Sequence, residues 1–396
     1  MTRLVLLILA LVLTAPGAYA QLGGLGVPNL PNVGGAVGDV GNAVGEVTDR
    51  TDRAVRDARE LANQRTERIR DLLRENRRAL EADPAGQPIV RNQVLAFDPS
   101  PAALERARSA GFEIARSDDL EGGGALVVLR APEGLSTRSA LRRLREADPE
   151  GVYDFDHLHL ESGFTTGAIA MGQQSAGGGP RIGLIDGGVS GNAAVISQRA
   201  FSSAAPVANT HGAAVASLLA RAAPGARILV ADIYGGLPTG GSSAALARAL
   251  SWLLSENVTV INVSLVGPRN RVVEAMVGRV VQRGVIVVAA VGNDGPAAAP
   301  LYPSAYDGVV GVTGVDARGR VLMEAVRGPQ VDFAALGIHA DPRVRGTSFA
   351  APIVAGLIAQ SSMQRLLASA QDLGSRGRDD VYGEGLVGGN LLSAAR

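Results

Sequence analysis

One serine of this chain stands where a nucleophile could work. Ser348 lies in a turn of small residues, just before an apolar run at residues 353–359 that predicts a buried helix. Backbone N–H groups at the start of a helix can stabilise negative charge that develops beside a serine hydroxyl. A serine hydroxyl is a weak nucleophile by itself, so it requires a base and a group that orients the base.

Histidine is the base that the composition leaves open. All 38 basic residues are arginine, and the chain has no lysine and no cysteine, which excludes serine–lysine dyads, Schiff bases, thiol nucleophiles, disulfides and thiolate metal sites. Of the four histidines, His211 follows a polar turn and opens an Ala/Val-rich segment that predicts a helix. The start of a helix would hold its imidazole rigidly beside a cleft. Taken alone, a histidine such as His211 is more often a capping or core residue than a catalytic base.

Two further polar residues follow predicted buried strands. Asp186 ends the apolar run at residues 182–185, and Asn293 follows a second run at residues 285–290. Ligands and catalytic groups gather at the carboxyl edge of an open α/β sheet. There Asp186 could hold the imidazole in one tautomer, and the Asn293 amide could donate to an oxyanion. Each could also be a simple turn residue, but the order Asp, His, Asn, Ser points to acyl transfer.

In this order and with these motifs, residues 181–396 resemble the peptidase domain of subtilisin-like serine proteases. The resemblance implies an α/β fold with a subtilisin-like parallel sheet flanked by helices. It implies Asp186 as the orienting acid, His211 as the general base and Ser348 as the nucleophile. Asn293 and the Ser348 N–H would form the oxyanion hole. The implied substrate-binding residues are Ser264, Leu265, Val266, Gly267, Ala289, Ala290, Val291 and Gly292.

The expected substrate is a protein or peptide that adds as an extended strand beside residues 264–266. Val266 stands where the family often has glycine, and Leu301 falls near the floor of the pocket for the residue before the scissile bond. Both would narrow this pocket, so we expect a preference for small or medium apolar residues there. We expect no cofactor and no metal ion, because no Asp/Asn-rich calcium loop is recognisable. The net formal charge of +0 speaks against a nucleic-acid partner, and we expect a monomeric peptidase domain.

The N-terminal part begins with segments of differing composition. Residues 1–20 have the positive start, apolar stretch and Ala-x-Ala ending of a signal peptide, which predicts an exported protein, secreted or periplasmic. An uncleaved anchor is the alternative. Residues 21–46 are rich in Gly and Val and predict a flexible leader. Residues 47–83 carry alternating charges and apolar residues near helical spacing, which predicts an amphipathic helix.

Residues 89–160 show the pattern β-α-β-β-α-β, which favours a small α+β domain of ferredoxin-like fold. By resemblance to the family, this domain is identified as a propeptide, an intramolecular chaperone and inhibitor whose tail lies in the cleft. Residues 161–180 would then be a linker and processing region. We expect self-cleavage between about residues 158 and 167.

Three histidines remain outside the expected catalytic site. His157 and His159 lie near the end of the expected propeptide, where they have either a purely structural role or a pH-sensitive role in release. His339 lies in a loop-like stretch, and we expect it to be structural.

Three other functions remain open. An esterase of another fold is disfavoured by the chain order and by the lack of a G-x-S-x-G elbow. Acid-active relatives with a carboxylate as base are disfavoured by His211. The third is a binding or inhibitory protein in which residues 89–160 block the peptidase domain permanently.

Overall fold

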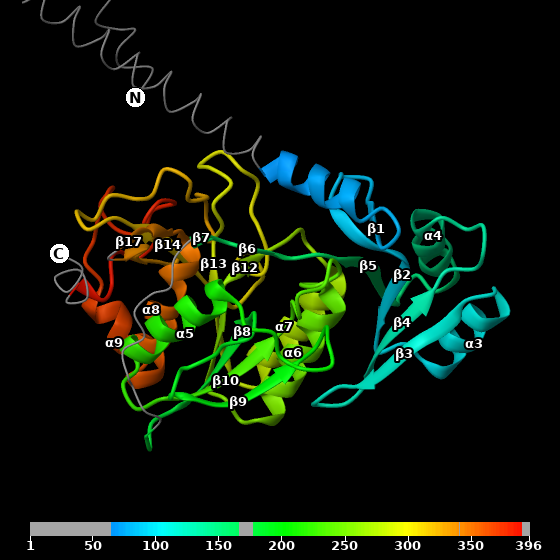
Figure 1. Cartoon of the computed structure of the whole chain (residues 1–396), viewed down its shortest axis with the longest axis horizontal. Coiled ribbons are helices and arrows are strands. Elements are labelled where there is room, and N and C mark those ends of the chain that lie inside the picture. Colours follow the sequence, from blue (N-terminus) through cyan, green and yellow to red (C-terminus); the bar gives the residue numbers. More distant parts are fainter. Residues whose placement is uncertain (1–64, 166–176, 340, 390–396) are drawn as a thin grey trace, which may run out of the picture. The chain divides into compact units, whose positions relative to one another are not determined.

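The computed structural model describes residues 65–165, 177–339 and 341–389 (Figure 1). They belong to the second of two compact units, Val55–Arg396. The predicted signal peptide, the predicted leader and the first part of the predicted helix at residues 47–83 lie outside the described residues.

The C-terminal domain, residues 181–389, is built on a seven-stranded sheet. Its strand order is β15-β14-β13-β11-β8-β10-β9, and neighbouring strands pair in parallel. Central strands such as β8 are nearly continuous apolar runs because both faces of the sheet are covered. The strands are β8 Arg181–Asp186, β9 Val195–Ala200, β10 Arg227–Asp232, β11 Val260–Val263, β13 Ile286–Ala290, β14 Val309–Val315 and β15 Phe333–Leu336.

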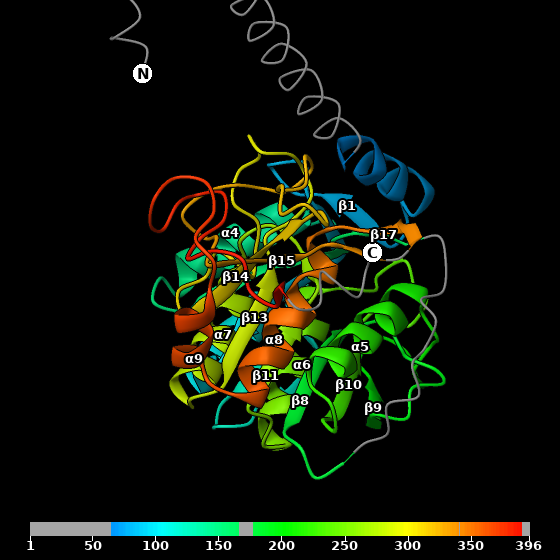
Figure 2. The same ribbon diagram turned by 90° about the vertical axis from the view of Figure 1, so that its left-hand side faces the viewer.

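Helices cover both faces of this sheet. Helices α5 and α8 pack on one face, where Ile182 and Leu184 of β8 point, and α6 and α7 pack on the other, where Ile185 points (Figure 2). This alternation follows from the two-residue period of a strand. The predicted parallel sheet flanked by helices is confirmed. The helices are α5 Thr210–Ala222, α6 Ser243–Ser255, α7 Arg271–Gln282, α8 Ala351–Gln360 and α9 Met363–Ser369. In the part of the chain that the structure describes, no helix has the length and apolar content needed to cross a membrane.

The N-terminal domain, residues 80–157, has an antiparallel sheet. β5 pairs with β2, β2 with β4 and β4 with β3, so the first strand of the β-α-β-β-α-β unit lies between the fourth and the third. Helices α3 and α4 cover one face with a core of their own. The predicted ferredoxin-like fold is confirmed. The elements are β1 Leu80–Ala82, β2 Pro88–Phe97, α3 Pro101–Ser109, β3 Glu113–Asp119, β4 Ala125–Arg130, α4 Thr137–Ala147 and β5 Val152–His157.

The predicted helix at residues 47–83 extends too far. Residues 65–75 are helical, but residues 80–82 form β1, which pairs antiparallel with β2. Leu80 is buried against Val90 and Leu158, and this tertiary packing outweighs the weak helical preference of a short segment.

The other face of the N-terminal sheet packs on α6 and α7. Leu95, Leu126 and Val128 share one hydrophobic cluster with the residues of these helices. The two domains therefore bury apolar surface together, on the side of the C-terminal domain opposite to α5 and α8.

Two carboxylates of β5 reinforce this contact. Asp154 accepts a hydrogen bond from the Arg271 N–H at 2.8 Å, and Asp156 accepts one from the Ala244 N–H at 2.9 Å. Each carboxylate thus lies at the positive N-terminal end of a helix, α7 or α6, where negative charge is stabilised. Strand β5 is thereby held so that the chain after it runs toward the carboxyl edge of the parallel sheet.

Candidate active site

Three elements bring together the residues of the expected triad. Asp186 ends the central strand β8, His211 lies in the first turn of α5, and Ser348 lies in the short 3-10 helix η1 (Thr347–Phe349) that precedes α8. His211 Nδ1 lies 3.0 Å from each oxygen of Asp186, and His211 Nε2 lies 3.1 Å from Ser348 Oγ. Residues separated by 25 and 137 positions in the sequence thus form one hydrogen-bonded chain.

The electrostatics of this chain suit a general base. When His211 donates from Nδ1 to Asp186, its Nε2 is left with a lone pair that can accept the Ser348 proton. Burial opposes the charged imidazolium, but the Asp186 carboxylate, with a contribution from Glu161, holds the pKa of His211 above its usual value. Asp186 accepts a further hydrogen bond from the Gly187 N–H at 2.8 Å, which helps to fix its carboxylate.

The segment that follows the N-terminal domain lies across this site. In this segment, which we call the tail (residues 158–163), β6 Leu160–Glu161 pairs antiparallel with β12 Leu265–Val266. The Ser162 N–H donates to the Ser264 carbonyl at 3.4 Å, and the Ser162 carbonyl accepts from the Ser348 N–H at 3.1 Å. The tail therefore occupies the cleft as an added strand.

The peptide bond between Ser162 and Gly163 lies at the nucleophile. A Cβ atom built on Gly163 would lie 2.4 Å from Ser348 Oγ and 3.4 Å from His211 Nε2. The Ser162 carbonyl has the Ser348 N–H as its donor, which is the relation that an oxyanion hole requires. This bond lies inside the region where the sequence predicts self-cleavage.

Asn293 lies beside the same residue of the tail. Its Nδ2 donates to Ser162 Oγ at 3.0 Å, and its Oδ1 accepts from the Thr347 N–H at 3.0 Å. The bond from Thr347 turns the amide so that its donor faces Ser162. In this structure the Asn293 amide bonds the Ser162 hydroxyl, so its role as oxyanion donor stays a prediction.

The surroundings of the Ser162 side chain are partly polar. Ser162 Oγ lies 3.2 Å from Thr347 Oγ1, which also accepts from the Gly292 N–H at 3.2 Å. Leu301 lies against Gly292, since a Cβ there would be 2.5 Å from Leu301 Cδ1. Val291 shares an apolar cluster with Leu301. Leu301 therefore fills the space beside Gly292.

The predicted substrate-binding residues divide into two groups. Ser264, Leu265 and Val266 contact the tail through the backbone. Gly267 lies against the imidazole of His159, because a Cβ atom built on Gly267 would lie 2.5 Å from His159 Cδ2. Ala289 and Ala290, by contrast, are fully buried in β13 and belong to the two cores of the sheet.

Several residues of the site were not assigned a role from the sequence. Thr347 orients Asn293, and Asn209 caps α5 by accepting from the Gly212 N–H at 3.0 Å while its Nδ2 donates to Glu161 at 2.8 Å. Thr347 adjoins the serine, and Asn209 stands at a recognisable N-cap position. The sequence around Glu161 does not indicate a role in the site, because only strand pairing brings this residue to the Asp186–His211 pair, which we call the dyad.

The remaining histidines are held in structural contacts. His157 lies between Asp83 Oδ2, 3.2 Å from its Nε2, and the Asn270 amide, 2.9 Å from its Nδ1. Burial lowers the pKa of His159 to about 3, so this imidazole stays neutral at physiological pH. Burial likewise lowers the pKa of His339 to about 4, and its Nε2 lies 3.1 Å from the Leu336 carbonyl. For His159 this favours the structural interpretation over a pH-sensitive one.

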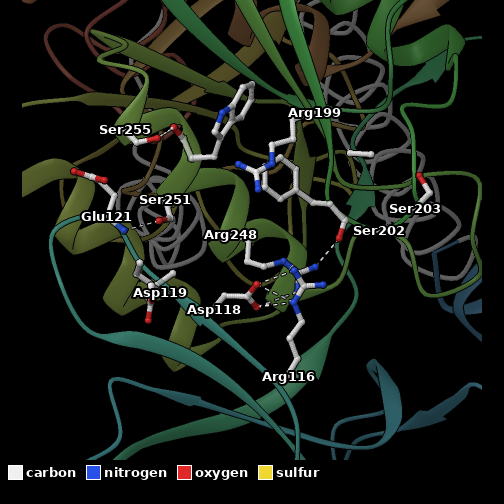
Figure 3. A pocket seen from close by; sticks show the side chains of 14 residues that line it. Arg116, Asp118, Asp119, Glu121, Arg199, Ser202, Ser203, Arg248, Ser251 and Ser255 are labelled. Carbon is white, nitrogen blue, oxygen red and sulfur yellow. Dashed lines mark hydrogen bonds and ion pairs between the residues drawn. The ribbon is translucent and has the colours of Figure 1, made fainter.

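A separate cavity of about 390 Å³ lies where β3 meets β9 and α6 (Figure 3). Two of its three arginines share one carboxylate, since Asp118 lies 2.7 Å from Arg116 and 3.6 Å from Arg248. Its lining contains serines but no histidine, so it offers no counterpart of the arrangement around Ser348.

Comparison with known proteins agrees with this geometry. The subtilase family model matches residues 177–373. Subtilisin Savinase of Lederbergia lenta is 31% identical over 217 residues, which cover 48% of this chain and 78% of that protein. The chain belongs to the subtilase family. The family match begins just before β8, so the N-terminal domain lies outside it.

Two further similarities extend this result. The thermostable alkaline protease of Halalkalibacterium halodurans is 29% identical over 244 residues, which cover 53% of this subtilase and 66% of that protein. The crystal structure of fervidolysin from Fervidobacterium pennivorans matches 80% of this chain and 62% of that chain, with a TM-score of 0.64 and 17% sequence identity, which shows a shared fold. The chain thus spans slightly less than two thirds of each of these two proteins.

Proposed function

We propose that this subtilase is an exported serine endopeptidase that first cleaves its own chain between Ser162 and Gly163. The observation that carries the proposal is the position of the Ser162 carbonyl. It accepts from the Ser348 N–H at 3.1 Å, while Ser348 Oγ lies 3.1 Å from His211 Nε2. Nucleophile, base and an oxyanion donor therefore converge on one peptide bond.

Acylation would begin when Ser348 Oγ attacks the Ser162 carbonyl carbon and His211 takes the hydroxyl proton. Asp186 stabilises the imidazolium that forms and keeps the ring in place. The oxyanion is held by the Ser348 N–H, and a small movement of the Asn293 amide from Ser162 Oγ to the carbonyl oxygen would supply the second donor. His211 then protonates the amine of Gly163, and the bond breaks.

Deacylation would repeat these steps with water. His211 takes a proton from water, the hydroxide attacks the Ser162 ester, and His211 returns the proton to Ser348 Oγ as the ester bond breaks. The chain up to Ser162 then ends in a carboxylate, and the pairing of β6 with β12 can keep the tail in the cleft. The N-terminal domain thereby acts as an intramolecular inhibitor until it leaves.

The same cleft would cleave other extended peptides. The strand β12 offers backbone pairing that does not depend on sequence, and the shallow pocket at Gly292 and Leu301 suits a small residue before the scissile bond. Ser162 itself is such a residue. This supports a preference for small residues, with Thr347 and Asn293 favouring serine among them.

Export rests on the composition of residues 1–20, which is that of a signal peptide. The relative named minor extracellular protease Epr, from Bacillus subtilis, is 27% identical over 167 residues. The intact mass of the Ser348→Ala variant recovered outside the cytoplasm tests this part directly, with removal of residues 1–20 as the expected result.

The intact mass of the recovered protein beside its Ser348→Ala variant tests the catalytic proposal. We expect the wild type to lose everything up to Ser162 and the variant to keep it. If both proteins are folded and both keep the bond between Ser162 and Gly163 intact, the proposal of self-cleavage is wrong. In that case the permanent blocking of the peptidase domain by the N-terminal domain becomes the better interpretation.

A further inference from the structure

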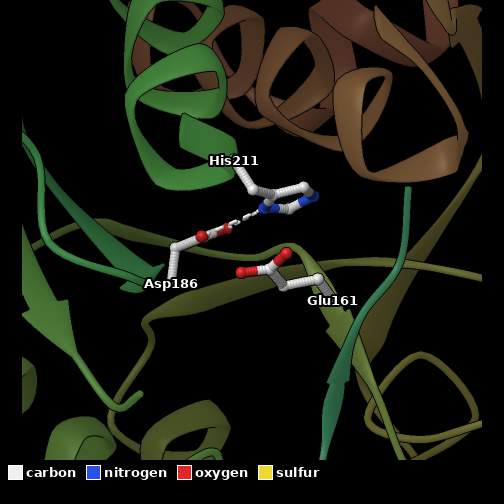
Figure 4. Close-up of side chains that lie close together, drawn as sticks. All are labelled: Glu161, Asp186 and His211. Atoms are coloured by element: carbon white, nitrogen blue, oxygen red, sulfur yellow. Dashed lines mark hydrogen bonds and ion pairs between the residues drawn. The ribbon is translucent and has the colours of Figure 1, made fainter. Parts of the chain in front are cut away.

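The tail brings a second carboxylate to the catalytic dyad. Glu161 is the residue before Ser162, and its carboxylate lies in one cluster with Asp186 and His211 (Figure 4). One potential ligand atom from each of the three residues lies within 4.8 Å of the other two. Glu161 reaches this place because it pairs with Leu265 in the β6–β12 ladder, which sets the face toward which its side chain points.

The cluster is better suited to ionic interaction than to metal binding. Nδ1 of His211 is engaged by Asp186, and Nε2 is engaged by Ser348, so the imidazole has no free lone pair for a metal ion. During acyl transfer His211 becomes positively charged, so the Glu161 carboxylate can interact with it as an ion pair.

Asn209 recognises the Glu161 side chain with a donor of fixed orientation. The Asn209 amide oxygen accepts from the Gly212 N–H at the start of α5, and its Nδ2 then donates to Glu161 Oε1 at 2.8 Å. The helix cap decides which way the amide faces, and Nδ2 therefore points toward the Glu161 carboxylate. The cleft therefore presents a ready donor to the side chain of the second residue before the scissile bond.

We propose that Glu161 assists the cleavage of its own chain by stabilising the imidazolium of His211, and that Asn209 holds this side chain beside His211, so that the cleft favours a carboxylate at this substrate position. The inference rests on the proposed endopeptidase function and extends it to a substrate class: peptides with an acidic residue followed by a small residue before the scissile bond.

Glu161 should accelerate cleavage because the positive charge on His211 develops only in the transition state. In the resting state His211 is neutral, and Glu161 and Asp186 repel each other. In the transition state His211 carries a positive charge, and both carboxylates attract it. A carboxylate in this place thus favours the transition state over the ground state, which is the condition for faster chemistry.

The same interaction makes cleavage depend on pH. Burial opposes charge on Glu161, and the neighbouring Asp186 raises its pKa further, whereas His211 and Asn209 favour its charged form. Glu161 in turn contributes to the raised pKa of His211. Protonated His211 cannot act as a base, so activity on the tail is lost as the pH falls through this raised pKa.

Two other ionisable side chains, Tyr234 and Asp232, lie near the cluster. Burial and the three carboxylates Glu161, Asp186 and Asp232 raise the pKa of the Tyr234 phenol well above its usual value, so it stays neutral. The Asp232 carboxylate accepts backbone N–H bonds from Val207, Tyr234 and Gly235.

Self-cleavage of the full chain tests this inference. Wild type and Glu161→Gln are diluted from denaturant into buffers between about pH 5 and 9, and the intact mass is followed over time. Glutamine keeps the shape and an oxygen for Asn209 but removes the charge. We expect the variant to cleave itself about threefold to tenfold more slowly at alkaline pH. The pH at which its rate falls on the acid side should lie about one unit lower, because the pKa of His211 drops when a nearby negative charge is removed. Glu113→Gln, which neutralises an exposed carboxylate of β3, is the matched control and should behave as wild type.

A second measurement does not depend on the folding of the variant chain. The recovered wild-type enzyme is given peptides that span residues 158–165 with Glu, Gln or Ala at position 161, and kcat/KM is measured for each. We expect the order Glu, Gln, Ala, and a smaller advantage of Glu over Ala in Asn209→Ser, which keeps a helix-capping side chain but removes the amide donor.

The outcomes separate the two proposals. Equal kcat/KM for the three peptides together with an unchanged pH profile in Glu161→Gln would overturn the role of Glu161 while leaving the endopeptidase intact. Absence of cleavage by the wild type, both of its own chain and of the peptides, would overturn the proposed function itself.

Discussion

Gly163→Ala tests the placement of the scissile bond without changing any residue of the expected triad. The added Cβ would lie 2.4 Å from Ser348 Oγ and 2.8 Å from Phe349 Cε2, whereas ordinary van der Waals contact lies at 3.4–4 Å. The tail or the nucleophile must therefore move by about 1 Å, and a misplacement of that size typically costs about 100-fold in rate. We expect self-cleavage of the variant to be slower by about this factor.

The assay is the rate constant for loss of intact mass in the full-length chain, with the two fragments identified by mass. Gly178→Ala is the matched control, because a Cβ at this position has no neighbour within 4 Å. It should process like the wild type. A peptide that carries Gly or Ala at position 163, given to the wild-type enzyme, checks the same contact without relying on refolding of the variant.

Two results would refute this reasoning. Cleavage of Gly163→Ala between residues 162 and 163 at a rate within about threefold of wild type would mean that Gly163 does not lie against Ser348, since the displacement argument requires a much larger loss. Cleavage at a different bond, with wild type still cut after Ser162, would mean that the β6–β12 pairing does not hold the tail in one register.

Four further predictions concern the triad, the oxyanion hole, the pocket and the contact between the domains. Asp186→Asn should lower kcat by up to about 10,000-fold through loss of the imidazole orientation, and Asn293→Ala should lower it by about 100- to 1000-fold; near-normal turnover in peptide assays would contradict either role. Leu301→Ala should deepen the pocket at Gly292 and raise kcat/KM for peptides with Leu or Phe before the scissile bond relative to Ala, and an unchanged ratio would place the pocket elsewhere. Burial raises the pKa of Asp156 to about 6 from 3.8, so its contribution to stability is present below about pH 4 and is lost as the pH rises through 6. Relative to Asp156→Asn, both in a Ser348→Ala background, the free energy of unfolding by urea should therefore fall by about 3 kcal/mol between pH 4 and 7, and parallel pH curves would exclude this effect.

The expected site residues could be predicted because each carries a local signal. Asp186 and Asn293 follow apolar runs, His211 opens an Ala/Val-rich helix, and Ser348 precedes another buried helix. In a parallel α/β sheet the strand ends share one edge, so residues that follow these strands or open the helices at that edge are expected to lie near one another. The β-α-β-β-α-β order of the N-terminal domain was readable for the same reason, since hydrophobic periods of two and near 3.6 are properties of short segments.

Only the tertiary structure decided which distant strands pair and which residues face each other across them. Residues 80–82 form a strand because β2 is available to pair with them, although their spacing continues a helical pattern. Ser162 lies at the nucleophile, and Glu161 at the dyad, because β6 pairs in one register with β12, about 100 residues later in the chain. Sequence by itself determined the chemistry that this chain can carry, in the types and element positions of its polar residues. Backbone hydrogen bonds between distant strands are alike at every residue, so the local sequence does not fix their register. Only the packed structure selects the peptide bond that meets Ser348 and the carboxylate that meets His211.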